Sequence, residues 1–180
     1  MKKRLLMLLV ILGSAYNSFS QDSMIALEVC SCLYGSPGID FEAGRNFEKC
    51  ILRQLELDVN IPNKEAYVIR FLNENVDELI CETTNDVDEV SVRDLEPMFK
   101  KAIGMGYYGV FKYMDENGRY KNKINLNHVE MVNGEKETVL DYLYNIFENE
   151  DLLEEYDADK IASLIFIVRR LGGKRANELK

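Results

Sequence analysis

The residue types in this chain that could carry out chemistry are its cysteines, its single histidine and its many carboxylates. A catalytic cysteine must be a free thiolate, and a catalytic histidine needs a nucleophile and an orienting group beside it. The segment around His128, INLNHVEMVNG, contains no such arrangement, and no G-x-S-x-G motif occurs in the chain. We therefore expect His128 to be a loop residue and not a catalytic base.

The carboxylates are grouped in acidic runs, mainly in the segments 86–89 and 148–159. Such runs usually form solvated faces, whereas the carboxylate pair of a glycosidase lies in a cleft among aromatic residues. Asp86-x-Asp88 lacks the glycine and the closing glutamate of a calcium loop, and GMGYYG lacks the lysine of a phosphate loop. We expect no catalytic residue, no metal and no cofactor.

The first twenty residues have the pattern of a secretory signal peptide. Lys2, Lys3 and Arg4 precede the apolar run Leu5 to Leu12, and small residues stand before a cut at Gln21. The apolar run is shorter than the ~20 residues that span a bilayer. We expect residues 1–20 to be removed and the mature protein to be periplasmic or secreted, without membrane insertion.

Cleavage makes the chain more acidic. It removes three of the 22 Lys and Arg and none of the 31 Asp and Glu, which leaves a net charge of −12. Nucleic acids and anionic membranes repel such a surface and are poor partners. A basic protein partner suits the charge, although acidity alone more often serves to keep an exported protein soluble.

All four cysteines remain after this cleavage: Cys30, Cys32, Cys50 and Cys81. An even number in an exported chain indicates two disulfides, for which three connectivities exist. The side chains of Cys30 and Cys32 point about 200° apart on a helix, so they should reach different partners and could not share a metal. If helices 23–34 and 41–57 are antiparallel, the position of Cys30 along the helix axis matches that of Cys50 slightly better than the position of Cys32 does. We therefore predict the pairs Cys30–Cys50 and Cys32–Cys81.

Amphipathic periodicity predicts an all-α fold. The helices expected in the first part are 23–34, 41–57 and one or two within 64–81, with a turn at 60–63 around Pro62. All cysteines fall in this part, so residues 22–84 should form a small module stapled by disulfides. Residues 85–180 should form a second unit.

The stretch PMFKKAIGMGYYGVFKYMDENG, Pro97 to Gly118, predicts two short helices. Proline suits a first turn, and Gly106 and Gly118 should end the two helices with positive φ. Phe99, Ala102, Val110, Phe111 and Met114 should be buried, while Lys100, Lys101 and Lys112 should face water. Further on, Leu140, Leu143, Leu164, Ile167 and Val168 should pack against this first pair.

The spacing of these features resembles the ankyrin repeat, which has a Thr-Pro-Leu-His start and glycines that end its helices. Pro97 stands near the start motif, and the two glycines are twelve residues apart. Thr138-Val139-Leu140-Asp141 is similar to a second start motif, and the helix 159–171 ends at Gly172-Gly173. The resemblance implies two degenerate repeats within residues 90–180, of the exported bacterial type.

The pattern also departs from that family. Gly118 and Gly172 are 54 residues apart instead of about 33, and the start histidine is absent from both copies. The additional residues should lie in the loop 119–136 and in the segment 145–157 between the helices of the second repeat. The segment 125–137 should be the connecting finger, with His128 near its tip, and the tail 174–180 should face water.

An ankyrin-like stack implies a protein-binding module, because its loops and first helices form an exposed face. We expect an immunity or inhibitor protein that binds a basic partner. The candidate binding residues are Asp86, Asp88, Glu89, Lys100, Lys101, Tyr107, Asn127, His128, Glu130 and Met131. The alternatives are a carboxylate-dependent hydrolase of the cell envelope and a structural envelope protein.

Overall fold

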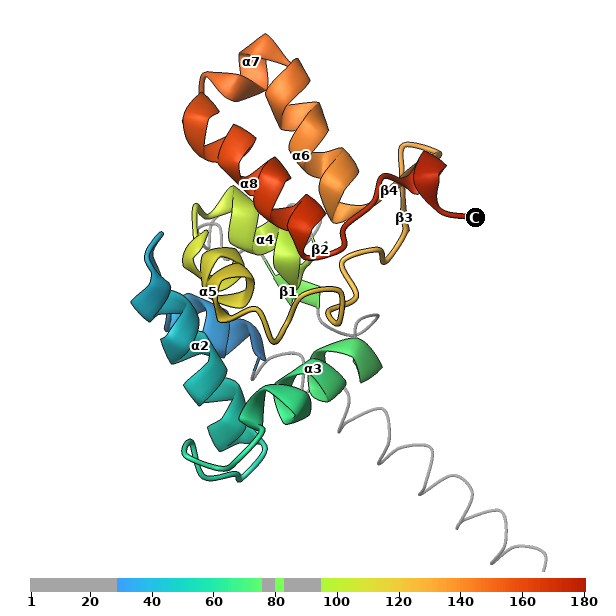
Figure 1. Cartoon of the computed structure of the whole chain (residues 1–180). Helices are drawn as coiled ribbons and strands as arrows, with labels where there is room; N and C mark the ends of the chain where they lie inside the picture. Colours follow the sequence, from blue (N-terminus) through green and yellow to red (C-terminus); the bar gives the residue numbers. More distant parts are fainter. Residues whose placement is uncertain (1–28, 76–79, 83–94) are drawn as a thin grey trace, which may run out of the picture.

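The computed structural model of the protein describes residues 29–75, 80–82 and 95–180. These residues are mostly helical, and the strands among them form two small antiparallel pairs (Figure 1). The expected all-α fold with a disulfide-stapled N-terminal part is therefore confirmed. The expected signal peptide, and the boundary between residues 84 and 85, lie outside the described residues.

The N-terminal part contains a helical segment, residues 29–34, followed by α2 (Phe41–Gln54) and α3 (Lys64–Glu74). Asp40 caps α2 by accepting a hydrogen bond from the backbone N–H of Ala43 at 2.9 Å. The buried stripe of α2 includes Phe47 and Ile51, as its periodicity predicts. The helix ends three residues before Leu57, because Glu56 adopts a φ of 55° that a helix cannot contain.

The prediction of helices throughout 64–81 was wrong at its end. The side chain of Asn75 bonds the carbonyl of Phe71, and α3 stops there. Strand β1 (Ile80–Glu82) follows and pairs with β2 (Leu95–Pro97). The pairing of β1 with β2 comes from residues too distant in the sequence for periodicity to reveal.

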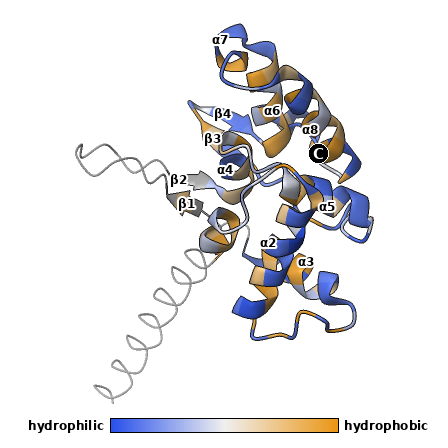
Figure 2. Ribbon diagram, turned by 90° about the vertical axis from the view of Figure 1, so that its left-hand side faces the viewer, coloured by the Kyte–Doolittle hydropathy of each residue, from blue (hydrophilic) through white to orange (hydrophobic). Residues whose placement is uncertain are grey.

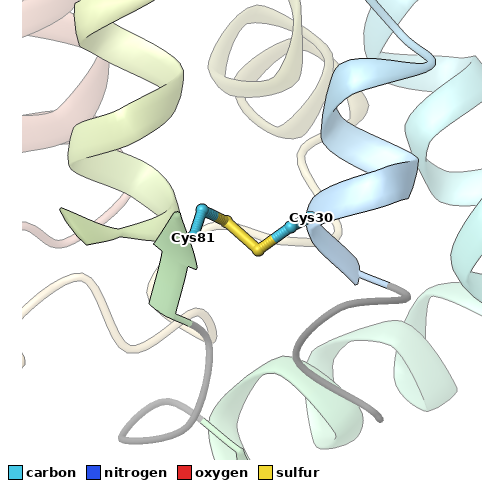
Figure 3. The surroundings of a disulfide bond; sticks show 2 residues. All are labelled: Cys30 and Cys81. Atoms are coloured by element: carbon cyan, nitrogen blue, oxygen red, sulfur yellow. A yellow bond between two sulfur atoms is a disulfide. The ribbon is translucent and has the colours of Figure 1, made fainter. Parts of the chain in front are cut away.

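All four cysteines form disulfides, as expected, but the predicted pairing was wrong. Cys30 is bonded to Cys81 and Cys32 to Cys50. Figure 3 shows the Cys30–Cys81 bond joining the helical segment 29–34 to β1. Cys30 and Cys32 do reach different partners. Their heights on a helix differ by only about 3 Å, so the direction of each side chain decides the pairing, and Cys32 is the one directed at α2.

The stretch that begins at Pro97 forms two helices, α4 (Met98–Gly104) and α5 (Gly109–Asn117). Gly106 has a φ of 71° after α4, and Gly118 has a φ of 66° at the C-cap of α5. Both predicted left-handed glycines are thus confirmed. Such φ values favour glycine because a Cβ would crowd the backbone.

The last part contains α6 (Val139–Glu148), α7 (Glu150–Leu153), α8 (Ala158–Arg170) and a 3-10 turn, η1 (Ala176–Glu178). Thr138 and Asp141 form a capping box at the start of α6. Asp157 caps α8 by accepting from the backbone N–H groups of Asp159 and Lys160. The segment 145–157 is not wholly an insertion, because its first four residues form the last turn of α6.

The helices pack in a fixed order around one core. Helix α2 packs on α5, α5 on α8, α4 on α6, and α6 on α8. The first helices of the two pairs, α4 and α6, thus contact each other, and so do the second helices, α5 and α8. The two pairs therefore share one hydrophobic cluster. The predicted core residues of both pairs are buried, except that Ile167 is half-buried. Figure 2 shows hydrophobic and hydrophilic positions mixed along the helices, as expected for amphipathic elements.

Candidate functional site

A β-hairpin leaves the helical body between the two helix pairs (Figure 1). Its strands are β3 (Glu130–Val132) and β4 (Glu135–Glu137). Asn133 and Gly134 join them with φ values of 52° and 85°, which suits a two-residue hairpin turn. The expected finger is therefore a β-hairpin with Asn133–Gly134 at its tip. The prediction that His128 lies near the tip was wrong, because this residue precedes β3.

A buried lysine holds the hairpin on α4. Glu130 and Glu137 are directly opposite each other across the strands, where two like charges repel. The Lys100 ammonium lies 2.7 Å from Glu130 Oε2 and 2.5 Å from Glu137 Oε1. Its side chain is only 4% exposed. The cation thus pairs with both carboxylates and makes their close approach favourable.

The same cluster reaches α6. Asn145 Nδ2 donates to the second carboxylate oxygen of Glu137 at 2.7 Å, and the Lys100 ammonium lies 5.7 Å from the centre of the Tyr142 ring. One ion cluster therefore ties α4, the hairpin and α6 together. It fixes the orientation of the hairpin on the helices, because a buried charge left without its partners is costly.

This arrangement corrects the expectation that Lys100 and Lys101 face water. Both lysines are buried, whereas Lys112 of α5 is exposed as predicted. Helix α4 is only seven residues long and packs against the β1–β2 pair and α6, while the hairpin contacts it through Lys100, so little of its surface is left to solvent. Lys100 therefore lies on the buried side of the hairpin, where it pairs with Glu130 and Glu137, and is not part of the exposed face of the candidate site.

The outward face of the hairpin is partly apolar. Strand alternation directs Glu130 and Glu137 toward Lys100, so Met131 and its cross-strand neighbour Lys136 point the other way. Met131 is 64% exposed, and Val129 and Val132 are more than a third exposed. Val132 alternates back to the face of Glu130, but it lies at the turn end of β3 and is exposed there. We call Val129, Met131, Val132 and Lys136 the hairpin surface. An exposed apolar group on a rigid support is typical of a protein-binding site.

A cavity of about 320 Å³ lies beside this surface, between the hairpin, the start of α6 and the C-terminal tail. Its lining residues are Val132, Asn133, Glu135, Lys136, Glu137, Asp141, Asn145, Arg175, Ala176 and Asn177. Glu137 is already paired with Lys100, and Arg175 Nε lies 2.9 Å from Asp141 Oδ1. These two carboxylates thus serve structural contacts.

Asp141 anchors the tail at this cavity. Burial alone would raise the pKa of its carboxyl, but hydrogen bonds from Ala176 N–H, Arg175 and Thr138 outweigh that effect and lower the pKa. The Ala176 N–H donates to Asp141 Oδ2 at 2.7 Å. The expectation that the tail simply faces water was therefore wrong for Arg175, which is partly buried against α6.

A second polar cluster is centred on Glu48 of α2, which is fully buried. Tyr120 Oη donates to Glu48 Oε2 at 2.5 Å, and the Lys64 ammonium lies 2.6 Å from Oε1 without the direction of a good hydrogen bond. Burial, and then the contact with Glu48, raise the pKa of Tyr120 and that of Tyr113. The cluster joins α2 to α5 and the segment after it.

Sequence reasoning missed the Glu48 cluster, because its members come from positions up to 72 residues apart. Helical periodicity does place position 48 next to the buried Phe47, but a glutamate there indicates a surface residue. A buried carboxylate flanked by two tyrosines has no local pattern that would reveal it.

The other predicted binding residues are dispersed. Asn127 bridges to the tail, donating to the Gly172 carbonyl at 3.1 Å and accepting from Lys174 N–H at 2.7 Å. His128 is half-buried beside Lys100 and Glu130, and Tyr107 is half-buried against the core. Asp86, Asp88 and Glu89 lie outside the described residues. Of the predicted set, the structure brings together Lys100, His128, Glu130 and, on the opposite face of the strand, Met131.

Within the described ranges, no group of three or more His, Cys, Asp and Glu side chains could hold a metal ion. In the same part of the chain, no helix is both long and apolar enough to cross a membrane. Comparisons with known protein families, curated proteins and solved structures find no match to the chain.

Proposed function

We propose that this chain is an exported protein-interaction module that binds a basic protein partner, as an immunity or inhibitor protein does. Residues 1–20 are the signal peptide in this proposal, and the two disulfides are compatible with an oxidising compartment. The two helix pairs with their hairpin act as a short ankyrin-like stack. The hairpin surface is the site of contact.

The observation that carries the proposal is the exposure of Met131 and its two valine neighbours on a hairpin that is held rigidly from behind. An apolar group gains most on binding when its support is already ordered, since less conformational entropy is then lost. The Lys100 cluster provides that order, because it holds both strands on α4. Methionine also adapts its shape well to a partner surface.

The charge of the chain favours a basic partner. The mature chain has a net charge of −12, and Glu135 lies exposed on the hairpin itself. Such a surface attracts a cationic protein and raises its association rate, more strongly at low salt. A salt-sensitive complex is therefore expected.

The test is a pull-down from envelope extract at low and at moderate salt, with the disulfide-bonded protein as bait. The matched baits are a double variant, Met131→Ser with Val132→Ser, and a control, Ile39→Ser. Ile39 is also exposed but lies in the loop before α2. We expect a partner that binds the wild type and the control, binds the double variant at least about tenfold more weakly, and dissociates as salt increases.

A partner that binds all three baits equally would contradict the hairpin surface as the site. If no protein is captured and the purified chain hydrolyses an envelope polymer, the hydrolase alternative is favoured instead. Mass spectrometry of the bait purified from the envelope tests export, because the intact 180-residue mass would contradict removal of residues 1–20.

A further inference from the structure

A second cavity lies between α3 and the segment 119–123, which follows α5 and runs beside α3 (Figure 1). Its volume is about 280 Å³, and none of the described residues that line it belongs to the hairpin surface. The chain as a whole is strongly acidic, yet three of these lining residues are cations. Cations gathered around a cavity in an acidic protein indicate a site for an anion.

The cations come from both walls of the cavity. Arg70 lies on α3, whereas Arg119 and Lys123 lie on the opposite segment. The only carboxylate among the described lining residues is that of Glu65, which is buried. Burial alone would raise the pKa of this carboxyl, but hydrogen bonds from its own backbone N–H and from Arg119 outweigh that effect and lower the pKa. Three cations thus face one ionised carboxylate, which gives the cavity a net charge of +2.

Glu65 engages only part of the Arg119 guanidinium. Both of its carboxylate oxygens lie 2.9 Å from the same nitrogen, Arg119 Nη1. Within the described residues, Arg119 Nε and Nη2 have no hydrogen-bond partner, and neither Arg70 nor Lys123 forms an ion pair. Adjacent N–H groups on Nε and Nη2 form a fork that binds an oxyanion through two parallel hydrogen bonds. The cavity therefore keeps its capacity to bind an anion after Glu65 has been neutralised.

Hydrogen bonds hold the two walls of the cavity together along the length of α3. The pair of Arg119 and Glu65 lies near the start of this helix. Near its end, Asn73 Nδ2 donates to the carbonyl of Lys123 at 2.6 Å, and Asn73 Oδ1 accepts from the backbone N–H of Asn125 at 2.8 Å. The cavity is thus formed before any ligand enters, so little conformational entropy is lost on binding.

The size and lining of the cavity indicate the class of anion. A water molecule occupies about 30 Å³ of liquid volume, so a cavity of about 280 Å³ has room for an organic body beside one charged group. Ala66 and Ile69 supply apolar surface for such a body. A phosphate monoester carries a charge of about −1.5 to −2 at neutral pH, which matches the net charge of the cavity better than one carboxylate does.

We propose that this cavity binds a small phosphate monoester. Arg70, Arg119 and Lys123 hold the phosphate group, and the organic part of the ligand lies against Ala66 and Ile69. The inference does not rest on the proposed function, because the hairpin surface takes no part in it.

The test is isothermal titration calorimetry of the purified, disulfide-bonded protein at low salt, with phenyl phosphate, inorganic phosphate and succinate as separate probes. We expect a dissociation constant below about 1 mM for phenyl phosphate, rising with salt because screening weakens the charge contacts. Inorganic phosphate should bind at least about threefold more weakly, because it lacks an apolar part. Succinate should also bind at least about threefold more weakly, because its two charges are on separate groups.

The variants are Lys123→Gln and Arg70→Gln, with Lys121→Gln as the matched control. Lys121 is exposed on the same segment as Lys123 but is not among the described residues that line the cavity. Each of the first two variants should raise the dissociation constant of phenyl phosphate at least about fivefold, and the control less than about twofold. Lys123 and Arg70 are exposed as well, and circular dichroism verifies that all three variants are folded.

Absence of phenyl phosphate binding up to about 10 mM would overturn the proposal. So would an equal loss of affinity in Lys121→Gln, because the overall charge of the segment would then be enough to explain the binding. Succinate that binds as tightly as phenyl phosphate would overturn phosphate as the ligand class. Inorganic phosphate that binds as tightly would exclude a contact between the organic part and the apolar lining.

Discussion

The Lys100 ammonium lies 2.5 Å from Glu137 Oε1, and this contact joins a helix to a strand 37 residues later in the chain. The lysine also reaches Glu130 at 2.7 Å, so it stands between two carboxylates that face each other across the hairpin. The salt bridge of an exposed lysine contributes little to stability. Loss of a buried lysine is strongly destabilising, because its carboxylate partners are left without a counter-charge. The hairpin, and with it the hairpin surface, depends on this cation.

Lys100→Met should therefore destabilise the protein by about 3–5 kcal/mol, because it leaves two partly buried carboxylates without their cation. The free energy of unfolding is measured by urea denaturation followed by circular dichroism. Lys112→Met is the control, since Lys112 is exposed on α5, and it should change stability by no more than about 0.5 kcal/mol. A loss below about 1 kcal/mol for Lys100→Met would show that the cluster does not hold the hairpin.

The anchor of the tail predicts a specific dependence of stability on pH. The folded-state pKa of Asp141 is lowered, so its ionised form stabilises the folded chain at every pH above the unfolded value of about 3.9. That contribution is lost as the pH falls from this value through the lowered folded-state pKa. Asp141→Asn, which keeps the shape but removes the charge, should cost about 1–3 kcal/mol at neutral pH.

The difference in unfolding free energy between wild type and Asp141→Asn should then shrink as the pH falls below about 4, because the wild-type carboxyl becomes protonated there. Urea denaturation at a series of pH values measures this. Asp159→Asn is a suitable control, because the side chain of Asp159 is exposed on α8. A difference that stays constant over this range would mean that the Asp141 charge does not stabilise the folded state.

The parts of the fold that the sequence predicted are those with a local cause. Glycines that must adopt positive φ, such as Gly106 and Gly118, interrupt an amphipathic pattern at fixed offsets. Asp157 stands directly before α8, and an aspartate in that position is a common helix cap. In each of these cases the relevant neighbours lie within four residues, so a short window contains the whole signal.

The parts that the sequence did not predict depend on distant contacts. Helical periodicity predicts that Lys100, next to the buried Phe99, is exposed to solvent. Lys100 is instead buried, because it pairs with Glu130 and Glu137 of the hairpin. The segment 64–81, predicted to hold one or two helices, ends in a strand because residues 95–97 pair with residues 80–82. The whole Glu48 cluster was missed for the same reason, since Tyr120 is 72 residues away from Glu48.

The two disulfides should stabilise the protein by different amounts, because they close loops of different length. Cys32 and Cys50 close a separation of 18 residues, and Cys30 and Cys81 close one of 51. Loop-closure entropy then assigns about 3 kcal/mol to the first bond and about 4 kcal/mol to the second. Replacing each pair by serines should therefore cost more for the longer loop, as measured by urea denaturation. Non-reducing peptide mapping gives the pairing itself, and a peptide that joins Cys30 to Cys50 would contradict the structure.

The closest approach between α2 and α5 yields the last prediction. At Gly44, an added Cβ would lie 2.2 Å from Tyr113 Cβ and 2.3 Å from the carbonyl oxygen of Gly109. Neither atom is at the free end of a side chain, so the helices would have to move apart.

Gly44→Ala should consequently destabilise the protein by at least about 1–3 kcal/mol, even though alanine is the better helix former. Gly104→Ala in α4 is the matched control, because its nearest atom would be Tyr142 Oη at 3.7 Å. That variant should be neutral or should stabilise the protein by up to about 1 kcal/mol. Thermal and urea denaturation of the two variants measure both effects. If Gly44→Ala were as stable as Gly104→Ala, α2 would not pack on α5 at the distance described, and the N-terminal helices would not be joined to the rest of the core in this way.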